Sequence, residues 1–300
     1  MKFNFPMDKL NLLNKIHSAK FEVSPFQHII IENFLDKNFF KKIITSKQIN
    51  TSVDEESDLK LINHLRDKGY EVIPFPGTLA NQEEYINWRK SKKTENDGLC
   101  EGIGLTLRLS KKIESELQDL LKFFEGPEFT NAVLKKFNYN FQNREFYHDG
   151  GIQKYLSDYE ISPHPDVRKK FLTWMLNINP MSNSQELNIH THYLSLIKKF
   201  SYISEFFKNN REIDRCWVPW DWCETIFKQD KNNSLVVFSP SDDTFHAVKA
   251  VYEHFEGQRT QLYGNLWYDT SEATYTTQWS DLDITNKLIT KAKERKNNFL

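Results

Sequence analysis

The chain has 300 residues, long enough for one large domain or two small ones, and its formal net charge is −1. A near-neutral chain has no bulk electrostatic attraction to nucleic acid or to an anionic membrane. Hydrophobic residues make up 39% of it and charged residues 27%, so it can bury a sizeable core and stay soluble. No stretch approaches the roughly eighteen apolar residues of a membrane span, and early charges make the opening segment a poor signal peptide. We expect neither a nucleic-acid nor a membrane partner.

The three cysteines, Cys100, Cys216 and Cys223, are odd in number and scattered. This pattern does not predict a disulfide framework, and the cytoplasm is the default compartment for such a chain. Cys216 and Cys223 could meet in space, but we interpret all three as free thiols.

The N-terminal part, residues 1–145, is predicted to be mainly helical. "FQHIIIENFL" indicates a buried strand, and "DKNFFKKIITSK" indicates a helix with Asp36 as its N-cap. Residues 50–100 are polar and contain "PFPG", which favours irregular structure. The apolar spacing of "SKKIESELQDLLKFFEG" predicts a helix with Ser110 as its cap and Gly126 as its stop. "PEFTNAVLKKFN" predicts a second helix, which begins at Pro127.

From about residue 146 to 270 the sequence consists mainly of short segments rich in aromatic and β-branched residues. These are "GIQKYLSDY", "KFLTWMLNIN", "NSLVVFSP" and "RTQLYGNLWYD", each bounded by turn residues. Residues 183–229 interrupt them as an insertion, partly helical and partly rich in Trp. Residues 271–300 are predicted to form a C-terminal helix. The expected fold class is α+β in a single domain, 1–300, with helices packed on short strands that close into a sandwich or jelly roll.

His164 and Asp166 stand two residues apart, so in a strand both side chains point the same way. His246, after the strand-like "SLVVF", could add a third ligand from a neighbouring strand. Two His and one carboxylate leave three positions of a metal open, an arrangement that suits non-haem Fe(II). The sequence contains other pairs of possible ligands, His148 with Asp149 and His190 with His192. Any single pair of this kind is weak evidence for a metal site.

Arg259 begins the next predicted strand, thirteen residues beyond His246. A dicarboxylate that chelates a metal at one end needs a cation for its other end, and Arg offers an always-charged fork. In the strand "FLTWMLNIN", Thr173, Met175 and Asn177 share one face, while Trp174 and Leu176 share the other. The sequence does not say which face lines a site.

The order His-x-Asp, His and Arg resembles the Fe(II)/2-oxoglutarate-dependent oxygenase superfamily, in particular its prolyl-hydroxylase-like branch. "FQHIIIENFLDKNFFKKI", "LQDLLKFFEGPEFTNAVLKKF" and "GGIQKYLSDYEISPHPD" resemble segments of that branch. The resemblance implies a double-stranded β-helix, which is a jelly-roll, cupin-like core. It implies that His164, Asp166 and His246 bind iron. It also implies that Arg259 binds the distal carboxylate of 2-oxoglutarate and that Tyr155 forms a hydrogen bond with the same co-substrate.

The resemblance also implies an activity, with Fe(II) as cofactor and 2-oxoglutarate and O2 as co-substrates. The enzyme would be a dioxygenase that hydroxylates an unactivated C–H of a small molecule or a peptidyl residue such as proline, releasing succinate and CO2. Asp166 favours hydroxylation over halogenation. Two features depart from the pattern: the gap between Asp166 and His246 is 80 residues, and Gln261 stands where many relatives carry Ser.

Three tryptophans of the insertion, Trp217, Trp220 and Trp222, are candidates for the substrate pocket, because loops at a barrel rim select substrates. They could instead simply pack the insertion onto the barrel. Two other functions stay open: a jelly-roll binding module, and another cupin metalloenzyme without 2-oxoglutarate turnover. The oligomeric state is not predicted.

Overall fold

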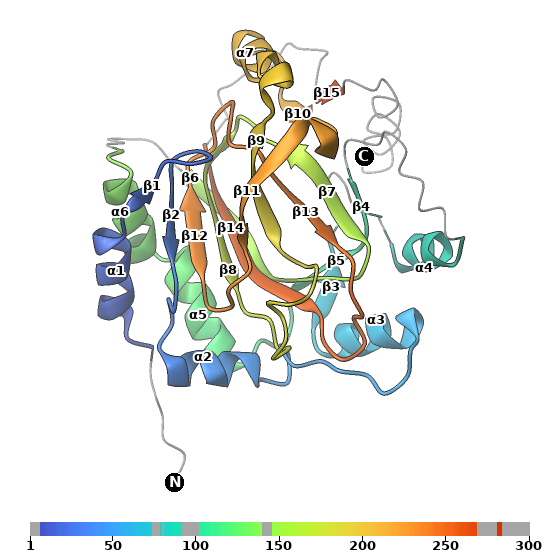
Figure 1. Ribbon diagram of the computed structural model, residues 1–300. Coiled ribbons are helices and arrows are strands. Elements are labelled where there is room, and N and C mark those ends of the chain that lie inside the picture. The colour runs from blue at the N-terminus through green and yellow to red at the C-terminus, as the bar shows by residue number, and fades with distance from the viewer. Residues whose placement is uncertain are drawn as a thin grey trace.

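The computed structural model describes residues 7–73, 79, 81–91, 102–139, 146–268 and 281–283. Most of its helices pack against the larger of two antiparallel sheets (Figure 1). The expected α+β class is therefore confirmed.

Seven α-helices lie within the described residues, most of them in the N-terminal half: α1 Lys9–Ser18, α2 Lys37–Ile44, α3 Asp58–Asp67, α4 Gln82–Ser91, α5 Ser115–Glu125, α6 Pro127–Lys136 and α7 Tyr202–Asn209. Two short 3-10 turns are η1 Lys198–Phe200 and η2 Trp220–Trp222.

The larger sheet has the strand order β1-β2-β12-β8-β14-β6-β5-β3. Its strands are β1 Phe21–Glu22, β2 His28–Ile31, β3 Tyr70–Val72, β5 Thr106–Leu109, β6 Phe146–Tyr155, β8 Lys170–Asn177, β12 Leu235–Phe238 and β14 Arg259–Tyr268. The N-terminal half adds strands to its helices: β2 lies in the predicted buried strand, whereas β1, β3 and β5 were not predicted, and the four form both edges of this sheet.

The smaller sheet has the order β11-β9-β13-β7-β4. Its strands are β4 Gly102–Ile103, β7 Tyr159–His164, β9 Thr191–Leu196, β11 Cys223–Gln229 and β13 His246–Ala250. A separate parallel pair joins β10 Arg215–Trp217 to β15 Asp281–Asp283.

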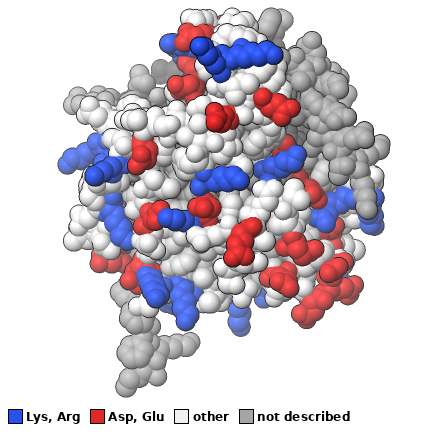
Figure 2. All heavy atoms as spheres, in the orientation of Figure 1, with Lys and Arg blue, Asp and Glu red and all other residues white. Residues whose placement is uncertain are grey.

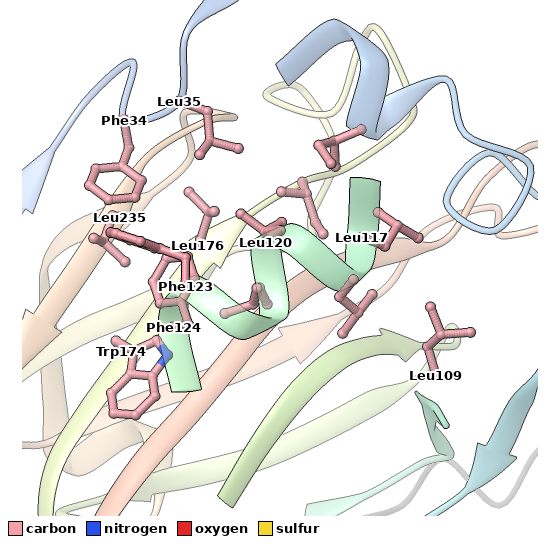
Figure 3. Close-up of a cluster of buried hydrophobic side chains, with 14 of the residues drawn as sticks. Phe34, Leu35, Leu109, Leu117, Leu120, Phe123, Phe124, Trp174, Leu176 and Leu235 are labelled. Atoms are coloured by element: carbon pink, nitrogen blue, oxygen red, sulfur yellow. The ribbon is translucent and has the colours of Figure 1, made fainter. Parts of the chain in front are cut away.

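Helices α1 to α6 bury their apolar sides against the outer face of the larger sheet, whereas α7 packs against the smaller sheet through Ile203 and Phe207. On α5, Leu117, Leu120 and Phe124 recur at helical spacing and are buried in one core cluster with Trp174 and Leu176 of β8 (Figure 3). Asp36 caps α2 as predicted, because its carboxylate accepts the amide protons of Asn38 and Phe39.

The α5 helix begins later than the prediction placed it, and Ser110 is not its cap. Its N-cap residue is Glu114, which makes no side-chain cap. The amide N–H of Glu114 donates instead to the side chain of Gln48, at 2.8 Å. A contact distant in sequence therefore sets this boundary, which the local pattern could not show.

The inner face of the larger sheet carries a different set of side chains. On β14, Arg259, Gln261 and Tyr263 line an internal cavity, whereas Leu262 and Leu266 lie in the helix-facing core. On β8, Met175 lines the same cavity and Trp174 packs outside it. Because side chains alternate along a strand, the face of "FLTWMLNIN" that carries Thr173, Met175 and Asn177 is the one turned toward the cavity.

Two further segments differ from the sequence prediction. Residues 50–100, expected to be irregular, contain α3 and α4, and α3 is held by the Ser57 cap and buried Leu61, Ile62 and Leu65. The stretch 183–229 is not wholly an insertion, since β9 and β11 belong to the smaller sheet and only α7 is α-helical. Pairing of β9 with strands on both sides overrides the local helical spacing.

The predicted C-terminal helix, 271–300, falls mostly outside the described residues. Its described part, Asp281–Asp283, forms the short strand β15 beside β10 rather than a helix.

Two observations concern the outer surface. Within the described residues, none of the helices combines the length and the apolar character needed to cross a bilayer. On the face shown in Figure 2, basic and acidic side chains are intermixed.

Leu120 provides a test of the helix-to-sheet packing. It is fully buried, so Leu120→Ala should lower the free energy of unfolding by about 2–5 kcal/mol through lost burial and a residual cavity. Leu10→Ala is the control, because Leu10 is 69% exposed and should change stability by no more than about 0.5 kcal/mol. Urea unfolding measures both, and equal effects would contradict this packing.

Candidate active site

Strand pairing brings the three predicted metal ligands together. His246 at the start of β13 lies directly opposite His164 at the end of β7, and Asp166 follows β7 by two residues. The imidazole centroids are 4.5 Å apart, and Nε2 of His246 is 4.0 Å from Oδ2 of Asp166. One ligand atom from each residue lies within 4.8 Å of the others, and all three side chains are buried.

Backbone carbonyls set the orientation of both imidazoles. Nδ1 of His164 lies 2.8 Å from the carbonyl oxygen of Ser162, and Nδ1 of His246 lies 3.0 Å from that of Thr244. A carbonyl can only accept, so each Nδ1 carries the proton and each Nε2 presents a lone pair. This is the arrangement that metal-binding histidines use.

The protonation states also suit a metal. Burial lowers the pKa of His164 to about 3, with the neighbouring His246 adding to the effect, and burial likewise lowers the pKa of His246. Burial alone would raise the pKa of Asp166, but the charge of Lys170 holds that pKa below its usual value. Two neutral imidazoles and one carboxylate are the forms that coordinate metals.

Two residues that were not predicted to belong to the site, Lys170 and Thr173, hold the carboxylate. Lys170 donates from Nζ to Oδ1 of Asp166 at 2.5 Å, and Thr173 donates from Oγ1 to Oδ2 at 2.6 Å. Lys170 also donates to the hydroxyl of Tyr263, at 2.8 Å. The spacing of Lys170, four residues after Asp166, was the available signal, but it is equally typical of a surface ion pair.

The triad opens into a cavity of about 650 Å³ between the two sheets. Arg259 and Tyr155 line this cavity together with the triad, so the structure brings to one space the five residues predicted for the metal and the co-substrate. The two are register partners on β14 and β6. The guanidinium carbon of Arg259 lies 4.3 Å from the centroid of the Tyr155 ring, a cation–π contact.

Arg259 is 2% exposed, and the described residues include no carboxylate that pairs with it. Its hydrogen bonds go to neutral oxygens only, those of Ile189, Thr191 and Gln261. A buried cation without a counter-charge is costly, which makes an anionic ligand the natural occupant beside it.

The three candidate tryptophans are placed differently. Trp217 is buried and lines the cavity, and the neighbouring amide of Val218 donates to the carbonyl of Pro163 beside the triad. Trp220 and Trp222 are not among the described residues that line it. Trp220 donates to Glu160 at 2.7 Å, and Trp222 stacks on Phe200 with centroids 4.0 Å apart. Packing thus accounts for the positions of these two.

The other histidine pairs identified in the sequence do not join the triad. His190 lies against the carbonyl of Gln185, and His192 contacts Thr225. His148 contacts Thr130 through Nε2.

Comparisons with known proteins found no matching family model and no significant match among curated proteins. Solved structures do match. A prolyl hydroxylase from Trichoplax adhaerens, in complex with a peptide fragment of the hypoxia inducible factor oxygen degradation domain, is 15% identical, with a TM-score of 0.42 over 90% of this chain and 93% of that one. A Pseudomonas putida prolyl-4-hydroxylase is 8% identical, with a TM-score of 0.44 over 86% and 98%.

A 2OG-Fe(II) oxygenase family protein from Burkholderia pseudomallei is 10% identical, with a TM-score of 0.32 over 73% of this chain and 94% of that one. Because identities and scores are low, the function proposed below rests on the geometry of the site.

The low pKa of His164 predicts a dependence of stability on pH. In the unfolded chain a histidine titrates near pH 6.5, whereas folded His164 stays neutral until about pH 3. The unfolded state therefore binds the extra proton, and the metal-free protein should lose stability as the pH falls below about 6.5. When the pH falls from 7 to 5, the free energy of unfolding of His164→Asn should decrease by about 1–2 kcal/mol less than that of wild type. Urea unfolding at the two pH values measures this difference. Equal losses would show that His164 is not buried as a neutral group.

Proposed function

We propose that this protein is an Fe(II)- and 2-oxoglutarate-dependent dioxygenase that hydroxylates an unactivated C–H bond, releasing succinate and CO2. One observation carries the proposal: a buried His-Asp-His set and a buried, carboxylate-free Arg259 line the same cavity. A metal site alone would fit many enzymes, and a buried arginine alone would fit many anions. Together they match a ligand that chelates a metal at one end and carries a carboxylate at the other.

The chemistry of the donor set fits Fe(II). Nε2 of His164, Nε2 of His246 and an oxygen of Asp166 would hold the metal on one face, leaving three positions for other ligands. When bound, iron with the keto-acid supplies the activation of O2. Thr173 and Lys170 keep the carboxylate of Asp166 oriented, and the carbonyls of Ser162 and Thr244 orient the imidazoles.

Arg259 would hold the distal carboxylate of 2-oxoglutarate, and the Tyr155 hydroxyl lies in the same part of the cavity wall. That hydroxyl donates to Oε1 of Gln153 at 2.5 Å in this structure and could turn to the co-substrate. The cavity of about 650 Å³ has room for a co-substrate and part of a further molecule. The primary substrate would be a small molecule or a peptidyl residue such as proline, with Trp217 in the pocket wall.

The strand arrangement supports a double-stranded β-helix as the core of a single domain. Strands β6, β8, β12 and β14 lie together in one sheet, and β7, β9, β11 and β13 lie together in the other. Along the chain, β6 to β9 alternate between the sheets, as do β11 to β14. Strands that alternate between two sheets in this way are what a jelly roll requires, and in such a core the triad would lie between the sheets.

The experiment that tests the proposal is succinate release from 2-oxoglutarate, run with Fe(II) and O2 and with metal binding measured in parallel. Wild type should bind one Fe(II) and form succinate slowly even without a primary substrate. His164→Ala, Asp166→Ala and His246→Ala should each weaken Fe(II) binding by about tenfold or more and abolish succinate formation.

The double change of His190 and His192 to Ala is the matched control, because these histidines lie on β9 or beside it but outside the triad. It should leave metal binding intact. If the control lost metal while the three single variants kept it, the ligand assignment would be wrong.

Arg259→Ala tests the co-substrate site. Removing the partner of a buried carboxylate costs about 2–5 kcal/mol, so the Michaelis constant for 2-oxoglutarate should rise far more than that for the primary substrate. Arg259→Lys should restore only part of the affinity, because Lys lacks the planar fork. Similar increases in both constants would argue that Arg259 only supports the fold.

A further inference from the structure

Residues 207–218, the wall segment, run from the end of α7 through β10. Three of them, Asp214, Arg215 and Trp217, line the cavity. Within the described residues, β10 pairs with β15 alone and belongs to neither the larger nor the smaller sheet. The position of this wall therefore depends on contacts other than the sheet hydrogen bonds that hold the other strands around the cavity.

One contact of the wall segment is with the start of the loop 163–168, which carries His164 and Asp166. The backbone N–H of Val218 donates to the carbonyl of Pro163 at 2.9 Å. Val218 is also buried in an apolar cluster with residues of β9 and β13. The wall is thus tied to the loop just before the first of the two ligands.

Arg168 makes the contact at the other end of this loop. Its Nε donates to the carbonyl of Ile213 at 2.8 Å, and its Nη2 donates to the carbonyl of Phe207. The guanidinium carbon lies 3.8 Å from the centroid of the Phe207 ring, a cation–π contact. Nη1 donates to the carboxylate of Asp242. All three guanidinium nitrogens are therefore bound, and two of them hold the wall segment.

The ion pair with Asp242 extends the connection to the third ligand. Asp242 lies four residues before His246, and the carbonyl of Thr244 between them orients the His246 imidazole at 3.0 Å. Two hydrogen bonds between Ser241 and the hydroxyl of Thr244 close this turn. Arg168 thus joins the wall segment to both stretches of chain that carry metal ligands.

We propose that Arg168 is a positioning residue that couples the wall segment to the metal ligands, so that filling the metal site fixes the wall on which Trp217 stands. The inference rests on the metal site of the proposed function. Coordination by His164 and Asp166 restricts the motion of the loop 163–168, and the hydrogen bonds of Arg168 carry this restriction into the wall segment. The wall is then completed only after the metal has bound, which favours metal first and primary substrate later.

The test is amide hydrogen exchange of the full chain with and without Fe(II), under nitrogen, read by mass spectrometry. In wild type, Fe(II) should slow exchange across residues 207–213 by about threefold or more. Arg168→Met keeps an unbranched stem against Phe207 and removes every donor. In this variant the slowing across 207–213 should be lost, whereas the slowing across 244–250, around His246, should persist.

Coupling is reciprocal, so the Fe(II) affinity provides a second readout. The Kd for Fe(II) should rise in Arg168→Met by a factor comparable to the slowing that is lost. Arg168→Lys should retain part of the slowing, because a single ammonium keeps the charge beside Asp242 but cannot reach acceptors on both segments. Tm, measured alongside, shows whether each variant has kept its fold.

Arg211→Met is the matched control, because Arg211 belongs to the same stretch, is exposed and does not line the cavity. It should leave both the Fe(II)-induced slowing and the Kd for Fe(II) as in wild type. A merely structural role of Arg168 predicts a different pattern. Exchange across 207–213 in Arg168→Met would then be faster by the same factor with and without Fe(II), and that result would overturn the coupling.

The failure of this inference is distinguishable from that of the proposed function. If wild type binds no Fe(II), the metal site fails, and the role of Arg168 fails with it. If wild type binds Fe(II) without any slowing of exchange across 207–213, only the coupling is overturned. The same holds if Arg168→Met shows the full slowing of wild type.

Discussion

The antiparallel pairing of β7 with β13 is the constraint on which the site depends. It sets His246 opposite His164 although 82 positions separate them in the sequence, and Asp166 follows directly from the end of β7. Directly opposed residues have Cβ atoms about 5 Å apart, which is the spacing two imidazoles need to share a metal. The 80-residue gap before His246 disturbs nothing, because β9 and β11 continue the same sheet within it.

The two sheets contribute different parts of the chemistry. The smaller sheet provides the histidines and Thr191, whereas the larger one provides Arg259, Tyr155 and the side chains that hold them. Between the sheets lie several polar groups that a purely structural core would avoid. Lys170 neutralises Asp166, but no described carboxylate neutralises Arg259. That imbalance of buried charge is the physical reason for expecting an anionic co-substrate.

Much of this arrangement was predictable from the sequence, because its signals are local. Helical spacing located α5 and α6, the Asp36 cap located α2, and strand alternation placed Thr173, Met175 and Asn177 on one face. The structure brings His164, Asp166, His246, Arg259 and Tyr155 together in one cavity. What could not be predicted depends on contacts distant in sequence. These are the pairing of β9 with β11 inside the supposed insertion, the contact of Gln48 with the start of α5, and the hydrogen bond between Gln261 and Asn177.

The central claim is that metal and keto-acid share one site, and the most direct measurement is the affinity for 2-oxoglutarate with and without Fe(II), in the absence of oxygen. If the triad and Arg259 hold two ends of one ligand, Fe(II) should tighten 2-oxoglutarate binding by at least about tenfold, and 2-oxoglutarate should tighten Fe(II) binding by the same factor. An affinity for 2-oxoglutarate that is the same with and without Fe(II) would contradict the account.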